Sequence, residues 1–356
     1  MQNKETLIWN NLNVRQVLRL SSTHHPKLTS AEIAGLWMQY MNETASLYMN
    51  KFLLQNLNDD DIRAIYEYAV HLGEQHVEKI QSFFESESYP IPEAFTEQDV
   101  STKAPKMFSD PLALHYLNIM SIHGCHGYSG AITTSSRKDV REYFSECLAS
   151  SVKLCNWTKD LLIDKGIYFR PPAITPPERP EFVQSKSFVA GLIGEKRPLT
   201  CIEITDILFN LKKSILAKAV LVAFHQVGKS SIVKRFLLEA IEVKEKHIET
   251  FAATLDDDNL PAPPTLESEI TDTMLSPFSD RLMMFQVGFL FSSAMVYYGS
   301  GLASSPRKDL VAKYMMAIGD DMKVSANWLR VMTDHGWMEQ PPLTENRKAL
   351  AMASKA

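Results

Sequence analysis

The residues of this chain best suited to chemistry are histidines and one cysteine on predicted helices. Three histidines occur in the segment 111–136, which contains no Asp, Glu, Lys or Arg, and two further candidates fall on the inward faces of other predicted helices. Imidazole nitrogen and thiolate sulfur are ligands that zinc, iron and haem accept. The sequence therefore raises the hypothesis of a metal or haem site in the first half of the chain, built from His76, His115, His123, His126 and Cys147.

An alternative interpretation of these histidines needs no cofactor. Buried histidines can bond to serine, tyrosine or backbone groups. The second half of the chain has Phe285, Ser293 and Val296 where the first half has three of the histidines. At most one half could then bind a metal in this way. Our leading expectation is that the chain has no cofactor, with zinc, iron or haem as the alternative.

The spacing argues against a standard di-iron or di-manganese carboxylate site, which requires Glu-x-x-His on two helices of a bundle. Gly73 and Lys244 stand three residues before His76 and His247, where the glutamates would be needed. The sequence also contains no GxxxxGK[ST] phosphate loop, no GxGxxG and no GxSxG elbow. No catalytic residue is predicted, and a non-enzymatic role is favoured.

The elements that must position these residues occur twice. LTSAEI at 28–33 matches LTCIEI at 199–204, and SSRKD at 135–139 matches SPRKD at 305–309. A register shared over such a length indicates duplication of a whole domain. The first block contains an S/T-x-x-E capping box in both copies, which predicts that a helix starts there twice.

Each copy is expected to contain four helices with one long connection. Pro90 and Pro92 end the second helix of the first copy, and the next start signal is Ser109-Asp110-Pro111. A long crossover between helices 2 and 3, with short connections elsewhere, is the ferritin-like arrangement. The predicted fold class is all-α, with two tandem ferritin-like four-helix bundles and a long helix 2 to helix 3 crossover in each.

The predicted organisation has five parts. Segment 6–21 is expected to form a short extra helix, and the prolines of RPPAITPPERP are typical of a stiff linker. The parts are an N-terminal extension at 1–23, a first bundle at 24–172, a Pro-rich linker at 173–196, a second bundle at 197–343 and a tail at 344–356.

Charge and composition narrow the partners. The net charge is −5 and no basic stripe occurs, so nucleic acid is not an expected partner. Four cysteines without a CxxC pair favour reduced thiols in the cytoplasm, and the N-terminus lacks the features of a secretory signal. The charge-free segment Leu282–Pro306 is long enough to span a bilayer, but its polar residues favour a buried bundle helix. No transmembrane segment is predicted.

Several blocks carry a resemblance to a known family: LTSAEI, FSD, SSRKD and KGIYFRPP in the first copy, and FSDRLMMFQV and SPRKDL in the second. The chain resembles the tandem domain-of-unknown-function 3231 proteins of endospore-forming bacteria, sometimes described as similar to spore coat proteins. The resemblance covers nearly the whole chain from about residue 24. It implies a ferritin-like fold and a coat or sporulation setting, and it implies no reaction.

Three functional hypotheses follow. The leading one is a structural or interaction protein, related to sporulation or the spore coat, with protein partners or a homo-oligomeric state. The second is the metal or haem site in the first copy. The third is binding of an apolar ligand or a membrane surface, which is motivated by the apolar residues of the charge-free segment: Met283, Met284, Phe285, Phe289 and Phe291.

Overall fold

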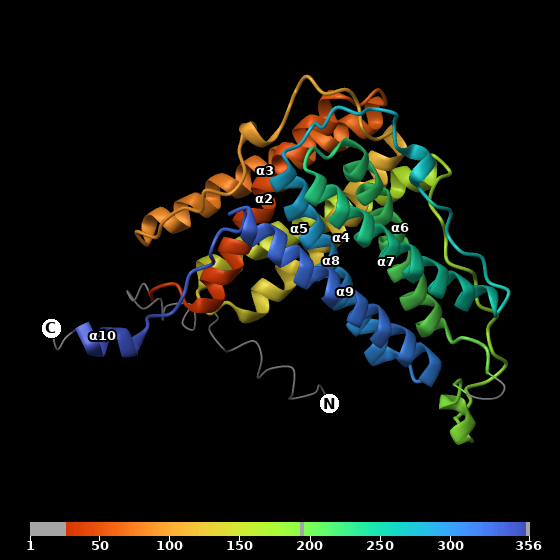
Figure 1. Ribbon diagram of the computed structural model, residues 1–356. Coiled ribbons are helices and arrows are strands. Elements are labelled where there is room, and N and C mark those ends of the chain that lie inside the picture. The colour runs from red at the N-terminus through yellow and green to blue at the C-terminus, as the bar shows by residue number, and fades with distance from the viewer. Residues whose placement is uncertain (1–25, 193–195, 354–356) are drawn as a thin grey trace, which may run out of the picture.

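The computed structural model describes residues 26–192 and 196–353, and over these ranges the chain is all-α (Figure 1). Within the described part, β pairing is confined to two isolated bridges. The predicted all-α class is therefore confirmed. The helix expected at 6–21 lies outside the described residues.

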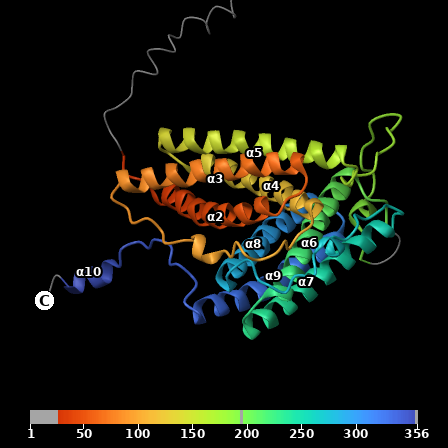
Figure 2. The same cartoon turned by 90° about the horizontal axis from the view of Figure 1, so that it is seen from above.

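Each copy contributes four long helices in the expected order. The connections 87–109 and 257–279 form the long crossovers, whereas the other loops within each copy are short. Figure 2 shows the four helices of each copy grouped together, with the second group lying at an angle to the first. A short helix follows at the C-terminal end. The helices are α2 (Ser30–Gln55), α3 (Asp60–Ser86), α4 (Asp110–Thr134) and α5 (Lys138–Asp164) in the first copy, α6 (Cys201–Val227), α7 (Ser231–Asp256), α8 (Asp280–Ser304) and α9 (Lys308–Asp334) in the second, and then α10 (Arg347–Ala353).

Capping residues explain where the first helix of each copy begins. Thr29 and Glu32 form the predicted capping box ahead of α2, and the second copy repeats it ahead of α6. Glu32 is inaccessible to solvent, and it also accepts hydrogen bonds from the backbone N–H groups of Ser136 and Arg137, each at 2.7 Å. One carboxylate thus ties the start of α2 to the start of α5.

The two crossovers hold each other through reciprocal hydrogen bonds, which we call the clasp. Ser279, the N-cap of α8, donates its N–H to the carbonyl oxygen of Asp99 at 2.8 Å and its hydroxyl to Asp99 Oδ1 at 2.6 Å. Ser109, the N-cap of α4, donates its N–H to the carbonyl oxygen of Glu269 at 2.9 Å and its hydroxyl to the Glu269 carboxylate. These are equivalent positions of the two copies. The copies therefore meet with approximate two-fold symmetry, as the subunits of an isologous dimer do.

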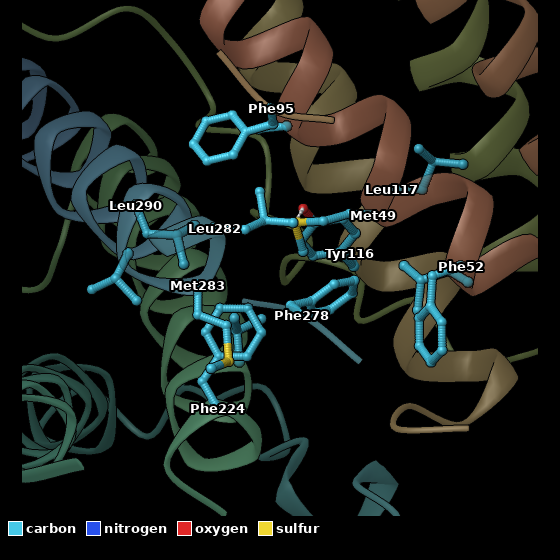
Figure 3. Packing of buried hydrophobic residues seen from close by; sticks show 14 of the residues in the cluster. Met49, Phe52, Phe95, Tyr116, Leu117, Phe224, Phe278, Leu282, Met283 and Leu290 are labelled. Carbon is cyan, nitrogen blue, oxygen red and sulfur yellow. Dashed lines mark hydrogen bonds between the residues drawn. The ribbon is translucent and has the colours of Figure 1, made fainter. Parts of the chain in front are cut away.

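Both copies also contribute to one hydrophobic core, part of which is drawn in Figure 3. Phe278 of the second crossover packs against Phe52 of α2, with ring centroids 5.3 Å apart, and against Phe224 of α6 at 6.2 Å. Phe95 of the first crossover contacts Phe285 of α8 at 4.9 Å. Packed aromatic side chains therefore join the copies, in addition to the linker.

Helix α8 contains most of the charge-free segment considered as a membrane span. Of the helices in the described ranges, it is the one long and apolar enough to pass a length and composition test for spanning. Leu282, Met283, Met284 and Val287 on this helix are inaccessible to solvent. They pack in the core that the two copies share, as the interpretation of a buried bundle helix expects.

Candidate functional site

The structure divides the five predicted metal ligands among three places. His76 and Cys147 lie in the middle of the first bundle, and His123 and His126 lie where α4 meets the second copy. His115 is half-buried elsewhere on α4, where burial and then Lys212 lower its pKa. Over residues 26–192 and 196–353, no three His, Cys, Asp or Glu side chains are arranged to hold a metal ion. The five residues do not come together, and metal binding stays a prediction.

The first of these places is a buried group with one side chain from each helix of the first bundle: Glu43, His76, Tyr128 and Cys147. We call it the first-copy polar cluster. Glu43 Oε1 lies 2.8 Å from His76 Nδ1 and also accepts a hydrogen bond from the Tyr128 hydroxyl. The Gln39 amide donates to Glu43 Oε1 at 3.3 Å and to Cys147 Sγ at 3.7 Å. The cluster links all four helices through polar contacts.

Electrostatics make His76 and Glu43 an ion pair. Burial alone would lower the pKa of His76, but the Glu43 carboxylate, with a smaller contribution from Cys147, raises it to about 10. Burial alone would raise the pKa of Glu43, but His76 and then Tyr128 bring it below its ordinary value. At neutral pH the imidazolium and the carboxylate therefore neutralise each other inside the bundle.

Glu43 and Tyr128 were not among the predicted site residues, although the spacing held a signal for Glu43. Leu36, Tyr40, Glu43 and Leu47 follow one another at intervals of four, three and four, which places them on one helix face. A carboxylate on the face that enters the core needs a partner there. That requirement points to a basic group on a neighbouring helix, and His76 meets it.

The second copy has an equivalent group with a different charge pair, the second-copy polar cluster: Ser214, Lys244, His247, Tyr298 and Asp321. Lys244 Nζ contacts both carboxylate oxygens of Asp321 at 2.8 Å, and both side chains are inaccessible to solvent. The Tyr298 hydroxyl lies 3.2 Å from His247 Nδ1 and 2.9 Å from Ser214 Oγ. His247 is therefore held by a hydroxyl where its counterpart His76 is held by a carboxylate.

Burial dominates the titration of this second cluster. It raises the pKa of Asp321 to about 6, against the opposing attraction of Lys244. It also lowers the pKa of Lys244, which Asp321 opposes. Burial, followed by repulsion from Lys244, lowers the pKa of His247 to about 3. At neutral pH the Asp321 carboxylate is ionised and His247 is neutral.

A third polar cluster lies between the copies and is centred on Tyr297 of α8, together with His123, His126 and Lys213. We call it the inter-copy cluster. The Tyr297 hydroxyl lies 2.9 Å from Nδ1 of His123 and 2.9 Å from Nδ1 of His126. Since it carries one proton, it donates to one imidazole and accepts from the other. Lys213 of α6 is buried with its Nζ over the rings of Phe209 and Tyr297.

The basic groups of the inter-copy cluster are neutral at neutral pH. Burial, and then Lys213, lowers the pKa of both His123 and His126. Burial lowers the pKa of Lys213 from 10.5 to about 5. A desolvated cation over an aromatic ring gains about 2 kcal/mol, or roughly 1.5 pKa units. That gain is too small to restore the charge of Lys213, so its side chain is a buried free amine.

One cavity borders these clusters, and another lies on the surface. One of about 10 Å³ lies between the copies, and its lining includes His123, Lys213, Ser214 and Lys244. The other, of about 420 Å³, is an open depression between α3 and α5 that includes Trp157 in its lining. The first has room for about one water-sized probe, whereas the second is part of the solvent-exposed surface.

Two stretches of the chain, residues 20–179 and 187–350, match the same family model, described as a protein of unknown function (DUF3231). No curated protein matches the sequence. A solved structure from Bacillus halodurans, described provisionally as a spore coat protein, is 20% identical over 42% of this chain and 98% of that chain, with a TM-score of 0.38. Because the two matched stretches cover most of the sequence, the chain belongs to the DUF3231 family and carries two tandem copies of its domain.

Proposed function

We propose that the protein is a structural or interaction protein in which the two copies act as one rigid body. The observation that supports this role most directly is the clasp, in which each crossover binds the N-cap serine of the other copy. The clasp fixes the outer helices of the two bundles relative to each other. A protein that presents a surface to its partners requires such a fixed arrangement. The setting that the family resemblance implies, the spore or its coat, is part of the proposal.

The proposal is tested by measuring whether assembly of the protein into a spore fraction depends on the clasp. The full chain is expressed from its own promoter in an endospore-forming host, and the coat, core and mother-cell fractions are probed with an antibody. We expect the chain in an assembled fraction, and we expect an Asp99→Ala, Glu269→Ala variant to stay unassembled because it loses the side-chain half of the clasp. Glu97→Ala is the matched control, since its exposed side chain is in the same crossover.

Two results would contradict this role. In the first, the clasp variant is folded and assembles as the unaltered chain does. In the second, deletion of the gene abolishes a metabolic conversion, and the clasp variant restores that conversion.

A second candidate, a single metal ion in the first copy, is favoured by one observation. Two of the predicted ligands, His76 and Cys147, both lie in the first-copy polar cluster. A metal there would have to displace the proton of His76 and draw the side chains together, because no three His, Cys, Asp or Glu side chains of the described residues are arranged to hold an ion. Elemental analysis and a visible spectrum of untagged protein, purified without chelator, test it. A metal in this cluster is lost in His76→Ala and retained in the His123→Ala, His126→Ala control, whereas a metal held between the copies behaves in the opposite way.

A further inference from the structure

One helix of the second copy, α9, has an apolar outer face. The side chains of Met315, Met322 and Leu329 are exposed to 61%, 60% and 45%. They follow one another at intervals of seven, which places them on one side of the helix. The centre of this face carries no charged residue over roughly 25 Å of helix. We call it the α9 stripe, and its members are Ala312, Met315, Gly319, Met322, Ala326 and Leu329.

The equivalent face of the first copy is polar, so the bundle itself does not require an apolar surface here. In the register that aligns SSRKD at 135–139 with SPRKD at 305–309, the stripe matches a set of α5 residues with two charged and two polar members: Glu142, Ser145, Ala149, Val152, Asn156 and Lys159. Figure 2 shows α5 and α9 on opposite sides of the molecule. A large exposed apolar patch usually marks a binding surface. Only the second copy has such a patch at this position.

Large and small side chains alternate along the α9 stripe. Each large residue, at 315, 322 or 329, stands three positions after a small one, at 312, 319 or 326. Packing within the chain does not explain the smallest of them, since a Cβ at Gly319 would meet no described atom within 4 Å apart from the adjacent backbone of α9. Glycine inside a helix is also less favourable than alanine. The alternation instead forms the knobs and holes into which another helix packs.

A second copy of α9 fits this surface when it runs in the opposite direction. Each large side chain then lies beside a small one of the other chain: Met322 beside Gly319, Met315 beside Ala326, and Leu329 beside Ala312. A parallel pair in register would place large beside large and small beside small, which leaves clashes and gaps. The antiparallel pair is also closed by a two-fold axis, as an isologous dimer requires.

The charges of α9 favour the same direction. Lys308 near the start of the helix and Asp334 at its end are both exposed. An antiparallel pair brings Lys308 of each chain close to Asp334 of the other, whereas a parallel pair brings like charges together. Arg330 is turned toward Asn327, to which it donates at 2.7 Å. Lys323 flanks the stripe, and its aliphatic stem can pack on the other chain while its charge stays in water.

We propose that two copies of this chain form an antiparallel two-fold dimer through the α9 stripe. The inference rests on the proposed function for its biological role, because it names a second copy of the chain as a partner to which the fixed bundles present a surface. The pairing itself is a property of the purified chain and is measured without spores.

Sedimentation of the purified full-length protein over a range of concentrations measures the pairing. We expect a monomer–dimer equilibrium. Gly319→Leu fills the space that Met322 of the other chain occupies, in a place with no neighbour inside its own chain. It should raise the dissociation constant by about tenfold or more, since both halves of the dimer are overpacked. Leucine is a better helix former than glycine, so the variant should be no less stable than the unaltered chain.

Ala149→Leu is the matched control, because Ala149 is exposed at the equivalent position of α5. It should leave the dissociation constant unchanged. A protein that is monomeric at every concentration overturns the proposal. A dimer that Gly319→Leu does not weaken, or that Ala149→Leu weakens equally, also overturns it.

Cross-linking with a carbodiimide tests the direction of the pair. Lys308 and Asp334 lie about 39 Å apart along one helix, so an amide bond between them can form only between two chains. We expect this cross-linked peptide pair from the unaltered dimer, and we expect its loss in Gly319→Leu. A dimer that is cross-linked elsewhere but never at this pair overturns the antiparallel arrangement.

These results are distinct from those of the spore-fraction experiment. A purified dimer whose chain never reaches an assembled fraction contradicts the proposed function and supports the pairing. A monomeric chain that does reach an assembled fraction through the clasp contradicts the pairing and supports the proposed function.

Discussion

At the residue scale, the two copies keep a compensated charge pair in the middle of each bundle but build it from different positions. The first copy uses Glu43 and His76, whereas the second has Ser214 at the position of Glu43 and pairs Lys244 with Asp321. A buried charge is tolerated when its partner is present. The shared feature is thus neutralisation between helices rather than a particular ligand set.

The ion pair of the first copy predicts a pH dependence of stability. The folded-state pKa of His76 is about 10, above its ordinary value of 6.5. Its contribution to stability is therefore fully present below pH 6.5 and is lost as the pH rises through about 10. Relative to His76→Gln, the free energy of unfolding should fall over this window by at most about 5 kcal/mol, as measured by urea unfolding. His247→Gln is the control, because the lowered pKa of His247 keeps it neutral throughout this pH range. The difference in free energy of unfolding between the unaltered protein and His247→Gln should therefore not change with pH. A change as large as the one measured against His76→Gln would contradict the assignment.

The ion pair of the second copy predicts a strong difference between one substitution and two. Lys244→Met leaves the inaccessible carboxylate of Asp321 without its partner, which should cost about 3 to 5 kcal/mol. Combining it with Asp321→Leu removes both charges and should recover most of that loss. Chemical denaturation of the three proteins measures both effects. If the double variant is as unstable as Lys244→Met alone, the contact between the two charges itself stabilises the bundle, and the loss is not caused by the unpaired charge.

At the element scale, the helices could be predicted because their signals are local. The capping box of Thr29 and Glu32 starts α2 as expected, and a long crossover precedes Ser109 as expected. The clasp could not be predicted, because Asp99 and Glu269 end short 3₁₀ turns, η2 (Glu97–Asp99) and η4 (Glu267–Glu269), that have no periodic pattern. Lys213 was also missed, since a lysine in a helix usually faces solvent, whereas the Nζ of this one is buried over the rings of Phe209 and Tyr297.

Two glycines on α8 predict opposite effects of the same substitution. A Cβ at Gly301 would lie 2.5 Å from Tyr314 Cζ on α9, whereas a Cβ at Gly299 would have no described atom within 4 Å apart from the adjacent backbone of α8. Gly301→Ala should therefore destabilise the protein by about 1 to 3 kcal/mol through overpacking. Gly299→Ala should stabilise it by about 0.5 to 1 kcal/mol, because alanine loses less backbone entropy in a helix. Thermal and urea unfolding measure both, and a destabilised Gly299→Ala would show that its face of α8 is covered.

At the scale of the whole molecule, the duplication could be predicted but the way the copies meet could not. The repeat of LTSAEI and RKD blocks shows that two similar bundles exist. It does not show that Phe278 of one copy enters the core beside Phe52 of the other. Contacts between folded units depend on the shape of both surfaces, which the period of a single helix does not encode. The two-fold arrangement can therefore be recognised only from the positions of the two crossovers in the structure.

The clasp and the shared core predict that the linker is not what holds the copies together. Residues 173–185 of the linker are exposed and lie away from the clasp and the shared core. A protease site placed there should therefore be cut without loss of structure. The two fragments should then elute together in size-exclusion chromatography, because the aromatic contacts and reciprocal hydrogen bonds persist. Adding Phe278→Ala, which removes a ring buried between the copies and should cost about 3 to 5 kcal/mol, should make the cut fragments separate while the uncut chain stays folded. If the fragments of the otherwise unaltered protein separate on cleavage, the copies are joined mainly through the linker, and the rigid joint on which the proposed function rests does not form.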